Sequence, residues 1–292
     1  MLSIGFIGAG ITGTSLAVRL YQQGYPIVAV SSRTLTSAEK LSKRIKDCQV
    51  YKTAQEVADR AELVFITTPD DVISEVAATV CWHNRQSVVH CSGAHSTNIL
   101  ESARQFGANP GCFHPLQTFA SVEKAIENLP GSTFAIEAEE SLLTVLKEMA
   151  TSMAGNWVIL KACDKVLYHA AAVFACNYLV TLVKLATDLW QDFGVPREQA
   201  IKALLPLLRG TLSNIENVGL PDCLTGPIAR GDVGTIKKHI EALEKEKPYL
   251  LSSYKQLGLQ TIPIALDKGK IDSDKAKELQ TLLTKQLQGV LP

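Results

Sequence analysis

The chain has 292 residues, of which 46% are hydrophobic and 20% are charged, and its 29 basic residues balance its 29 acidic residues. This composition is typical of a globular protein and excludes a disordered or low-complexity chain. No basic run rises above RIK or KK, so we expect no nucleic-acid partner and no acidic-membrane partner.

The cysteines and the most apolar segment bear on where the protein works. The seven cysteines form no CxxC pair and no zinc-ligand spacing, so we expect no metal site. Most lie in apolar runs, which favours free thiols in a reducing cytoplasm. Met1 leads into an apolar strand without a basic leader, which predicts no signal peptide. Polar residues interrupt the apolar segment 166–190, so we predict a core helix there and no bilayer span.

Residues 1–161 alternate short apolar runs with helical patterns. The predicted strands are LSIGFIG, YPIVAVS, AELVFITT, QSVVHCSG, NPGCFH, STFAIEA and NWVILK, and the predicted helices cover 11–22, 36–46, 71–80, 96–105 and 139–152. Strands that alternate with helices form a mostly parallel sheet covered on both faces. The first part of the chain is therefore predicted to be a doubly wound α/β domain.

Residues 162–292 show helical patterns alone. The predicted helices cover 163–193, 197–218, 233–244, 247–258 and 272–288, and the breaks between them contain glycine and proline. We therefore predict a domain boundary near residue 161, followed by an all-α domain that binds the substrate and forms a dimer interface.

The strongest motif is a GxGxxG at Gly8-Ala9-Gly10-Ile11-Thr12-Gly13. It follows the first predicted strand and opens an amphipathic helix, which is the context that predicts a Rossmann-type dinucleotide site. Gly8 allows a tight turn, Gly10 lets a diphosphate approach the backbone, and Gly13 lets helix and strand pack closely. The N-terminus of the helix then faces the diphosphate. A purely structural glycine-rich turn is the alternative.

The end of the second strand indicates which dinucleotide binds. NAD enzymes place an acidic residue there to hold the ribose 2′-hydroxyl, whereas this chain has Ser31-Ser32-Arg33 and no acid before Glu39. Hydroxyls and a guanidinium suit a 2′-phosphate, so we predict NADP(H) as cofactor. The alternative is that Arg33 is simply solvated.

Polar loops follow three further strands. Thr67-Thr68-Pro69, Ser92-Gly93 and His114 all fall at the carboxyl ends of strands, where such folds bind ligands. We expect them to line a crevice for the nicotinamide and the substrate. A helix cap, a plain turn and a rigid loop start are the respective alternatives.

The first helix of the second half, YHAAAVFACNYLV, carries His169 and Asn177 among apolar residues. On one helix these side chains lie about 80° apart around the axis and about 12 Å apart along it. They can line one crevice but cannot reach one oxygen atom together. A core histidine and an amide bonded to neighbouring backbone are the alternatives.

The stretch LTGPIARGDVGT places Arg230 and Asp232 in a loop before a helix. The two side chains could bind a substrate carboxylate and hydroxyl. Asp232 could equally cap the helix that begins at residue 233.

Together GFIGAGITG, SSRT, HCSGAHS, FHPLQTF and LTGPIARGDVGT resemble a bacterial family of Rossmann-like proteins whose C-terminal helical domain was formerly of unknown function. The resemblance covers nearly the whole chain. The family is related to ketopantoate reductases, 3-hydroxyacid dehydrogenases and pyrroline-carboxylate reductases, and some members resemble an alternative, NADPH-preferring ketopantoate reductase of pantothenate synthesis. The resemblance implies a homodimer formed through the helical domain.

One departure concerns the proton donor. The resemblance implies that the 3-hydroxyacid dehydrogenases and the ordinary ketopantoate reductases carry a lysine one turn before the asparagine on this helix, but the corresponding residue here is Val173. His169 is therefore the first candidate for the general acid, His114 the second and Lys165 the third.

These observations predict an NADPH-dependent oxidoreductase that acts on the CH–OH group of a small carboxylate, with 2-dehydropantoate as the expected substrate. Asn177 would orient the carbonyl, a histidine would supply the proton, and Arg230 would bind the carboxylate. An imine reductase of the pyrroline-carboxylate type and a non-enzymatic NADP(H)-responsive binding protein are the alternatives.

Overall fold

The computed structural model describes residues 2–285, and the chain divides into two compact units, Met1–Tyr178 and Leu179–Pro292. The last strand of the first unit ends at Ile159, close to the boundary expected near residue 161. The first compact unit nevertheless continues through the next helix, α8 (Lys165–Ala175).

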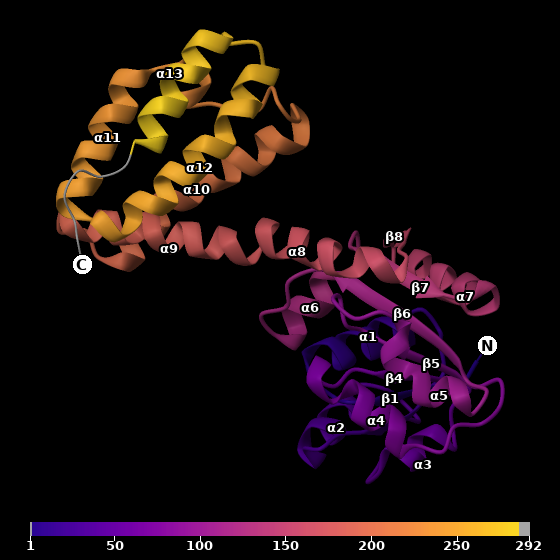
Figure 1. The fold of residues 1–292 in the computed structure, drawn as a ribbon. Helices are drawn as coiled ribbons and strands as arrows, with labels where there is room; N and C mark the ends of the chain where they lie inside the picture. The colour runs from indigo at the N-terminus through magenta and orange to yellow at the C-terminus, as the bar shows by residue number, and fades with distance from the viewer. Residues whose placement is uncertain (1, 286–292) are drawn as a thin grey trace. The chain divides into compact units, whose positions relative to one another are not determined.

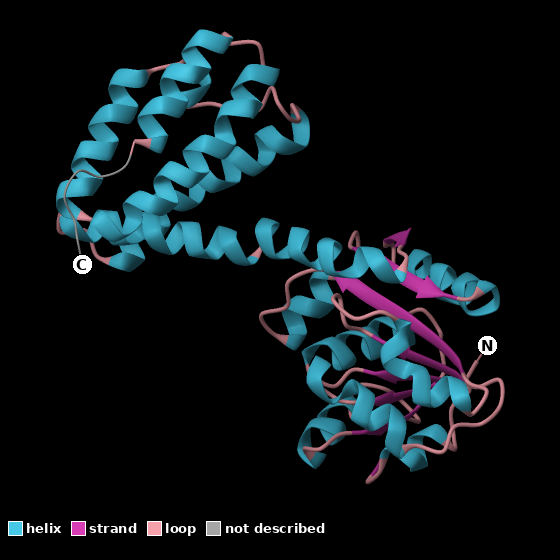
Figure 2. Ribbon diagram, in the orientation of Figure 1, coloured by secondary structure: helices cyan, strands magenta, loops and turns pink. Residues whose placement is uncertain are grey.

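An eight-stranded sheet forms the centre of the first unit (Figures 1 and 2). Its strands are β1 (Ile4–Ile7), β2 (Ile27–Ser31), β3 (Gln49–Tyr51), β4 (Leu63–Ile66), β5 (Ser87–His90), β6 (Asn109–Leu116), β7 (Thr133–Ala138) and β8 (Asn156–Ile159), in the spatial order β3-β2-β1-β4-β5-β6-β7-β8. All neighbours are parallel except β6 and β7. The order in which strands are added to the sheet reverses between β1 and β4. Doubly wound folds bind their ligands at such a reversal.

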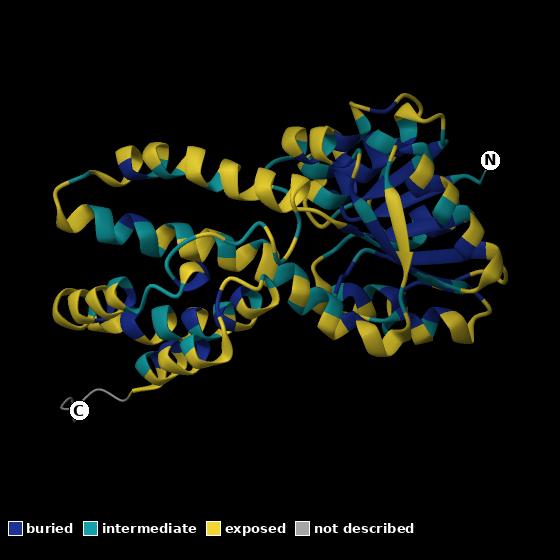
Figure 3. Cartoon of the chain, turned by 90° about the horizontal axis from the view of Figure 1, so that it is seen from above, coloured by how far each residue is buried: buried dark blue, intermediate teal, exposed yellow. Residues whose placement is uncertain are grey.

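Two hydrophobic cores cover the two faces of this sheet, as the predicted α/β class requires. One core contains residues of α1 (Ile11–Gln22), α2 (Leu35–Ser42) and α7 (Glu140–Ser152), and α6 (Val122–Asn128) packs on α1. The other contains residues of α3 (Ala54–Ala58), α4 (Ile73–Thr79) and α5 (Glu101–Gln105). Strand residues such as Phe6, Phe65 and Val64 are fully buried. Figure 3 shows most of the sheet in dark blue, the colour of buried residues.

All seven predicted strands of the first unit form, but three short elements were not predicted. Strand β3 has three residues, too few for a period to be read, and helices α3 and α6 are one to two turns long. A signal for α3 was present: Thr53 and Glu56 form a capping box, in which each side chain accepts the other residue's backbone N–H.

The second unit is helical, as expected. It contains most of α9 (Asn177–Asp192), then α10 (Arg197–Asn217), α11 (Val233–Glu246), α12 (Pro248–Asp267) and α13 (Ser273–Thr284). Its core is built from α11, α12 and α13, with Leu251, Ile262 and Leu279 at its centre. Helix α12 runs past the predicted end at residue 258 and includes Pro263, because Ile262 and Ala265 are buried in this core. The last three residues of the predicted helix 272–288 lie outside the described part of the chain.

The segment expected to form one core helix differs from that prediction in two ways. It is divided at Cys176 into α8 and α9, and its large apolar side chains are mostly exposed, among them Leu167 at 76% and Phe174 at 70%. By length and composition alone, Ala162–Asp192 could cross a membrane. The segment is helical and apolar, as predicted, but nothing within the described chain buries these side chains.

Candidate functional site

The glycine-rich turn after β1 is shaped by two close backbone approaches. Gly8 has φ +110°, and a Cβ added there would lie 2.8 Å from the carbonyl carbon of Thr67. A Cβ at Gly13 would collide with the Thr67 hydroxyl and lie 2.6 Å from the Gly8 carbonyl oxygen. A Cβ at Gly10, by contrast, would meet nothing within 4 Å. Gly10 therefore faces open space at the N-terminus of α1, while Gly8 and Gly13 hold the turn against β4.

A cleft of about 500 Å³ opens in front of this turn. Of the residues singled out in the sequence it is lined by Gly8, Ala9, Gly10, Ser31, Ser32, Arg33, Thr67, Thr68 and Pro69. Ile11, Thr12 and Gly13 lie beside it in the first turn of α1, whose N-cap Gly10 makes no side-chain cap. The free N–H groups and the positive dipole end of α1 make this end of the cleft a site for a diphosphate.

The other end of the cleft is cationic. Arg33 and Lys52 line it together with the hydroxyls of Ser32, Thr34 and Ser37. Helix α2 begins here, and its N-cap Thr34 makes no side-chain cap either. None of the described lining residues is acidic. Lys52 was missed in the sequence because it follows β3, the strand that is too short to predict.

Thr67 and Thr68 play different parts. Thr67 Oγ1 donates a hydrogen bond of 2.8 Å to the Gly8 carbonyl and so ties β4 to the glycine turn. Thr68 Oγ1 is buried but has no hydrogen-bond partner among the described residues. A buried hydroxyl is normally paired, and Thr68 is one of the residues that line the cleft.

The loop after β5 is fixed by internal hydrogen bonds. Ser92 Oγ donates to Asp70 Oδ2 at 2.6 Å and accepts the backbone N–H groups of Ala94 and His95. This places the Gly93 backbone against two imidazoles, since an added Cβ would lie 2.8 Å from His114 Nε2 and 2.7 Å from His169 Cδ2.

His114 and His169 therefore meet at Gly93, although one belongs to β6 and the other to α8. Their ring centroids are 6.3 Å apart, and His114 Nδ1 lies 2.8 Å from the hydroxyl of Tyr168. Burial, and then the positive charge of Lys165, lowers the pKa of His114 to about 4. His114 is neutral at pH 7, so the imidazolium form needed to protonate a product is scarce on this residue. The sequence did not point to Tyr168, because no motif distinguishes this tyrosine from the other aromatic residues.

Lys165 has no exposed surface, and its positive charge acts on His114. Its Nζ donates to Cys112 Sγ at 2.8 Å and is 3.9 Å from Glu137 Oε2. The thiol of Cys112 donates in turn to the carbonyl of Ser92 at 3.3 Å. Burial raises the pKa of Cys112 to about 11, so the thiol keeps its proton and holds the loop after β5.

The other predicted site residues are Asn177, Asp232 and Arg230. Asn177 begins α9 and is exposed, although its neighbours in sequence are apolar. Asp232 caps α11, with both carboxylate oxygens bonded to Thr235, whose backbone N–H lowers the pKa of that carboxyl. Arg230 is an exposed residue of the second unit, in the loop before this cap. The structure thus favours the cap for Asp232 and leaves Arg230 available to a ligand.

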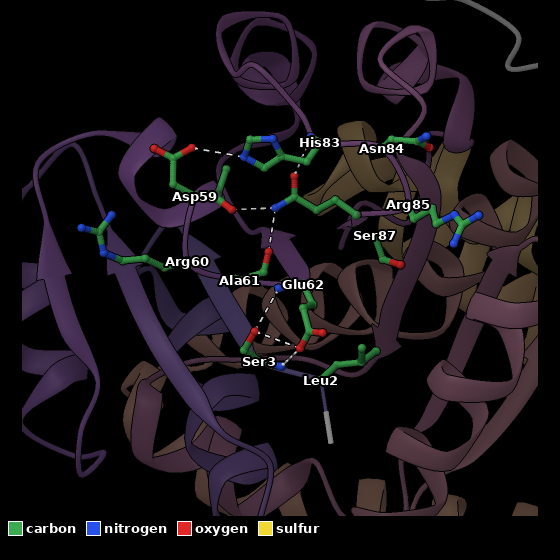
Figure 4. Close-up of a pocket in the computed structure, with 12 residues that line it drawn as sticks. Leu2, Ser3, Asp59, Arg60, Ala61, Glu62, His83, Asn84, Arg85 and Ser87 are labelled. Atoms are coloured by element: carbon green, nitrogen blue, oxygen red, sulfur yellow. Dashed lines mark hydrogen bonds and ion pairs between the residues drawn. The ribbon is translucent and has the colours of Figure 1, made fainter.

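A second depression, of about 420 Å³, lies at the amino ends of the strands (Figure 4). The backbone N–H of Ser3 donates to Glu62 Oε2 at 2.8 Å, and Gln86 Nε2 donates to two backbone carbonyls. Its polar groups mostly bond to one another. Ligands of open α/β sheets bind at the carboxyl ends, so we assign no site here.

The sheet order, the glycine turn at the crossover and the helix N-terminus behind it define a dinucleotide-binding fold. Residues 1–115 match the model of a Rossmann-like domain, and residues 132–261 match a domain of unknown function, DUF2520. The two matches together cover most of the chain and agree with the resemblance that the sequence motifs suggested. The sequence matches none of the curated proteins with which it was compared.

Several solved structures are similar over most of the chain. A Bacteroides fragilis protein provisionally described as an NADP oxidoreductase is 26% identical, with a TM-score of 0.72, and the match covers 90% of this chain and 98% of that one. A Thermotoga maritima protein is 25% identical, with a TM-score of 0.73 and 91% and 99% covered. The 1-pyrroline-5-carboxylate reductase of Streptococcus pyogenes is 16% identical, with a TM-score of 0.60 and 96% and 98% covered, which shows a shared fold alone.

Proposed function

We propose that this protein is an NADP(H)-dependent reductase. The observation that carries the proposal is the cleft at the glycine turn, which has helix N–H groups at one end and Arg33 and Lys52 at the other. The first end suits the diphosphate and the second suits the 2′-phosphate. The unpaired hydroxyl of Thr68 is a further partner for the cofactor. When bound, NADPH would supply a hydride, and the similar Bacteroides fragilis protein supports this assignment.

The cationic end of the cleft gives the first test. Replacing Arg33 with alanine is expected to weaken NADPH binding by about 10- to 100-fold, because a hydrogen bond to a charged group contributes about 1.5–3 kcal/mol. NADH binding should hardly change, because NADH lacks the 2′-phosphate. Lys52→Ala should act in the same direction. Titration calorimetry with each cofactor measures both constants.

Lys40 is the matched control for this test, since it is an exposed lysine of α2 that does not line the cleft. Lys40→Ala should leave the preference for NADPH intact. An equal loss of NADPH and NADH affinity in Arg33→Ala would contradict the assignment of this end of the cleft to the 2′-phosphate.

For the substrate we propose a small carbonyl compound that carries a carboxylate, with 2-dehydropantoate first and pantoate as its product. The supporting geometry is the pair His114 and His169 at Gly93, which brings two polar rings to the carboxyl ends of β5 and β6. His169 would supply the proton, Asn177 would orient the carbonyl, and Arg230 would bind the carboxylate. Most of the rate would come from holding the carbonyl against the nicotinamide.

An imine is the second candidate substrate. The observation in its favour is the likeness of the fold to the Streptococcus pyogenes pyrroline-carboxylate reductase. The same histidine pair could protonate or bond an imine nitrogen. Related dehydrogenases have a lysine at the position of Val173. Because this chain lacks that lysine, the third candidate is an NADP(H)-responsive binding protein without turnover.

The experiment that separates these candidates follows the loss of NADPH absorbance with 2-dehydropantoate, other small 2-keto acids and pyrroline-5-carboxylate. Oxidation with a keto acid supports the proposed function, and oxidation with the imine alone replaces it with the second candidate. Tight NADPH binding without oxidation of any of them would leave the binding protein. We propose a cytoplasmic location for the same protein, supported by seven unpaired cysteines.

We also propose that two copies of the chain pair through α8, α9 and α10. The supporting observation is the number of large apolar side chains that these helices expose: Val166, Leu167, Phe174, Tyr178, Val180, Leu182, Leu205, Leu207, Leu212 and Ile215. Monomeric proteins rarely expose so many large apolar side chains. The double variant Val180→Asp and Leu212→Asp is expected to convert a dimer into a monomer, measured by light scattering after size exclusion. Lys277→Asp on α13 should leave the mass unchanged, and a wild-type monomer would contradict the proposal.

A further inference from the structure

We propose that Tyr168 and Lys165 are positioning residues that keep His114 uncharged with its one ring proton on Nε2, so that His114 donates a hydrogen bond to the reacting carbonyl or imine. This inference rests on the proposed function for the identity of the reacting group. It assigns different tasks to the two histidines: His114 polarises the double bond, and His169 supplies the proton.

The contact between Tyr168 and His114 selects the tautomer. The Tyr168 hydroxyl lies 2.8 Å from His114 Nδ1, and the two rings meet edge to face at 90°. Burial raises the pKa of Tyr168, so the hydroxyl keeps its proton at neutral pH. Among the described residues, Nδ1 is the one acceptor within reach of this O–H. If Nδ1 instead carried the proton and donated it, the hydroxyl proton would be left without a partner in a partly buried place.

The surroundings of His114 keep the ring uncharged. The titratable groups that face it come from every element packed against it: Lys165, Tyr168 and His169 on α8, Asp70 in the 3₁₀ turn after β4, His90 on β5 and Cys112 on β6. Burial opposes a positive charge on His114, and Lys165 and His169 oppose it further. Asp70 acts the other way, but its carboxylate is bonded to Ser92. Lys165 is itself held by Cys112 and by Glu137.

The neutral ring then presents its N–H beside Gly93 and His169. Nε2 has no hydrogen-bond partner among the described residues, and it lies at the Gly93 backbone, beside the His169 ring. A neutral imidazole N–H polarises a carbonyl without transferring its proton, and a fixed donor of this kind stabilises the charge that develops on oxygen. The side chain at position 93 must be absent, since a Cβ would fill the space between the two rings.

The inference is tested without any substrate, by nitrogen NMR of the histidine side chains in the full-length protein. His114→Gln identifies the His114 signals among those of the six histidines. In the wild type we expect His114 to carry its proton on Nε2 and to remain neutral down to about pH 4. A proton on Nδ1, or protonation of His114 between pH 6 and 7, would overturn the inference.

Two variants separate the two positioning roles. Tyr168→Phe should let the proton of His114 distribute over both nitrogens, whereas Lys165→Met should raise the pKa of His114 towards its ordinary value of about 6.5. His239 provides an internal comparison, because its Nδ1 is also 2.8 Å from a tyrosine hydroxyl, that of Tyr254. Tyr254→Phe should change His239 and leave His114 as it was, and Lys161→Met should change neither.

Activity then reports separately on the proposed function. If reduction of any substrate is found, Tyr168→Phe should lower kcat by about tenfold or more with little change in NADPH affinity. His114→Asn, which keeps an N–H donor, should retain more activity than His114→Ala. The expected tautomer in a protein without reductase activity would overturn the proposed function and leave the arrangement of His114 established.

Discussion

Gly13→Ala is expected to destabilise the protein by about 1–3 kcal/mol and to abolish measurable NADPH binding, while Gly10→Ala should impair binding alone. Gly10 and Gly13 belong to one motif, but the space around them differs in the structure. A methyl group at position 13 would collide with the Thr67 hydroxyl and the Gly8 carbonyl, and both are fixed by the hydrogen bond between them. Overpacking of this kind costs about 1–3 kcal/mol and would shift the turn out of shape.

Gly10 is the matched control, because a methyl group there meets no protein atom within 4 Å. Its backbone is extended, with φ −76°, which alanine adopts without strain. Gly10→Ala should therefore change the free energy of unfolding by less than about 1 kcal/mol, the usual cost of alanine at an N-cap. The methyl group would instead occupy the approach of the diphosphate and weaken NADPH binding. Urea unfolding and fluorescence titration with NADPH measure the two effects.

Equal destabilisation by the two alanines would contradict this reading of the turn. A Gly10→Ala protein that binds NADPH like the wild type would mean that the diphosphate does not lie over Gly10. This second result would count against the cleft as the cofactor site.

His169→Ala is expected to lower kcat for the substrate by about 100- to 10,000-fold, the usual contribution of a positioned proton donor. NADPH affinity should stay within about twofold of the wild type, because His169 belongs to α8 and does not line the cleft. His169 is the better proton donor of the pair because His114, with its pKa lowered to about 4, has almost no imidazolium form at pH 7.

The control for this variant is His239→Ala, which removes a histidine of the second unit that is bonded to Tyr254 and does not line the cleft. It should leave kcat unchanged. If His169→Ala retains full turnover while His114→Ala loses it, the two histidines have their roles exchanged. Stopped-flow measurement of NADPH oxidation distinguishes a loss of chemistry from a loss of cofactor binding.

Several features of the fold followed directly from local patterns. Runs such as AELVFITT contain residues that are buried on both faces of the sheet, and continuous apolar runs of that length predict central parallel strands. The GxGxxG motif was informative because its neighbours in sequence, β1 and α1, are also its neighbours in space. The serines and Arg33 after β2 line the cleft for the same reason.

The patterns were least informative where a residue acts through a distant partner. Lys52 lies beside Arg33 only because β3 adds to the edge of the sheet. Tyr168 is one of many aromatic residues until β6 brings His114 to its hydroxyl. Lys165 was the third candidate for the proton donor, but no local pattern predicts that it is completely buried against Cys112 and near Glu137.

The sequence by itself determined the class of fold, the two-part organisation and the expected cofactor, because these depend on periodicity and on motifs whose residues are close in the chain. Only the tertiary structure decided which polar residues at the sheet edge are buried and how they are paired. It showed His114 neutral above a buried lysine, Asp232 as a helix cap and the apolar face of α8 and α9 exposed. Burial, electrostatic charge and hydrogen-bond partners arise between segments far apart in the chain, and no local pattern encodes them.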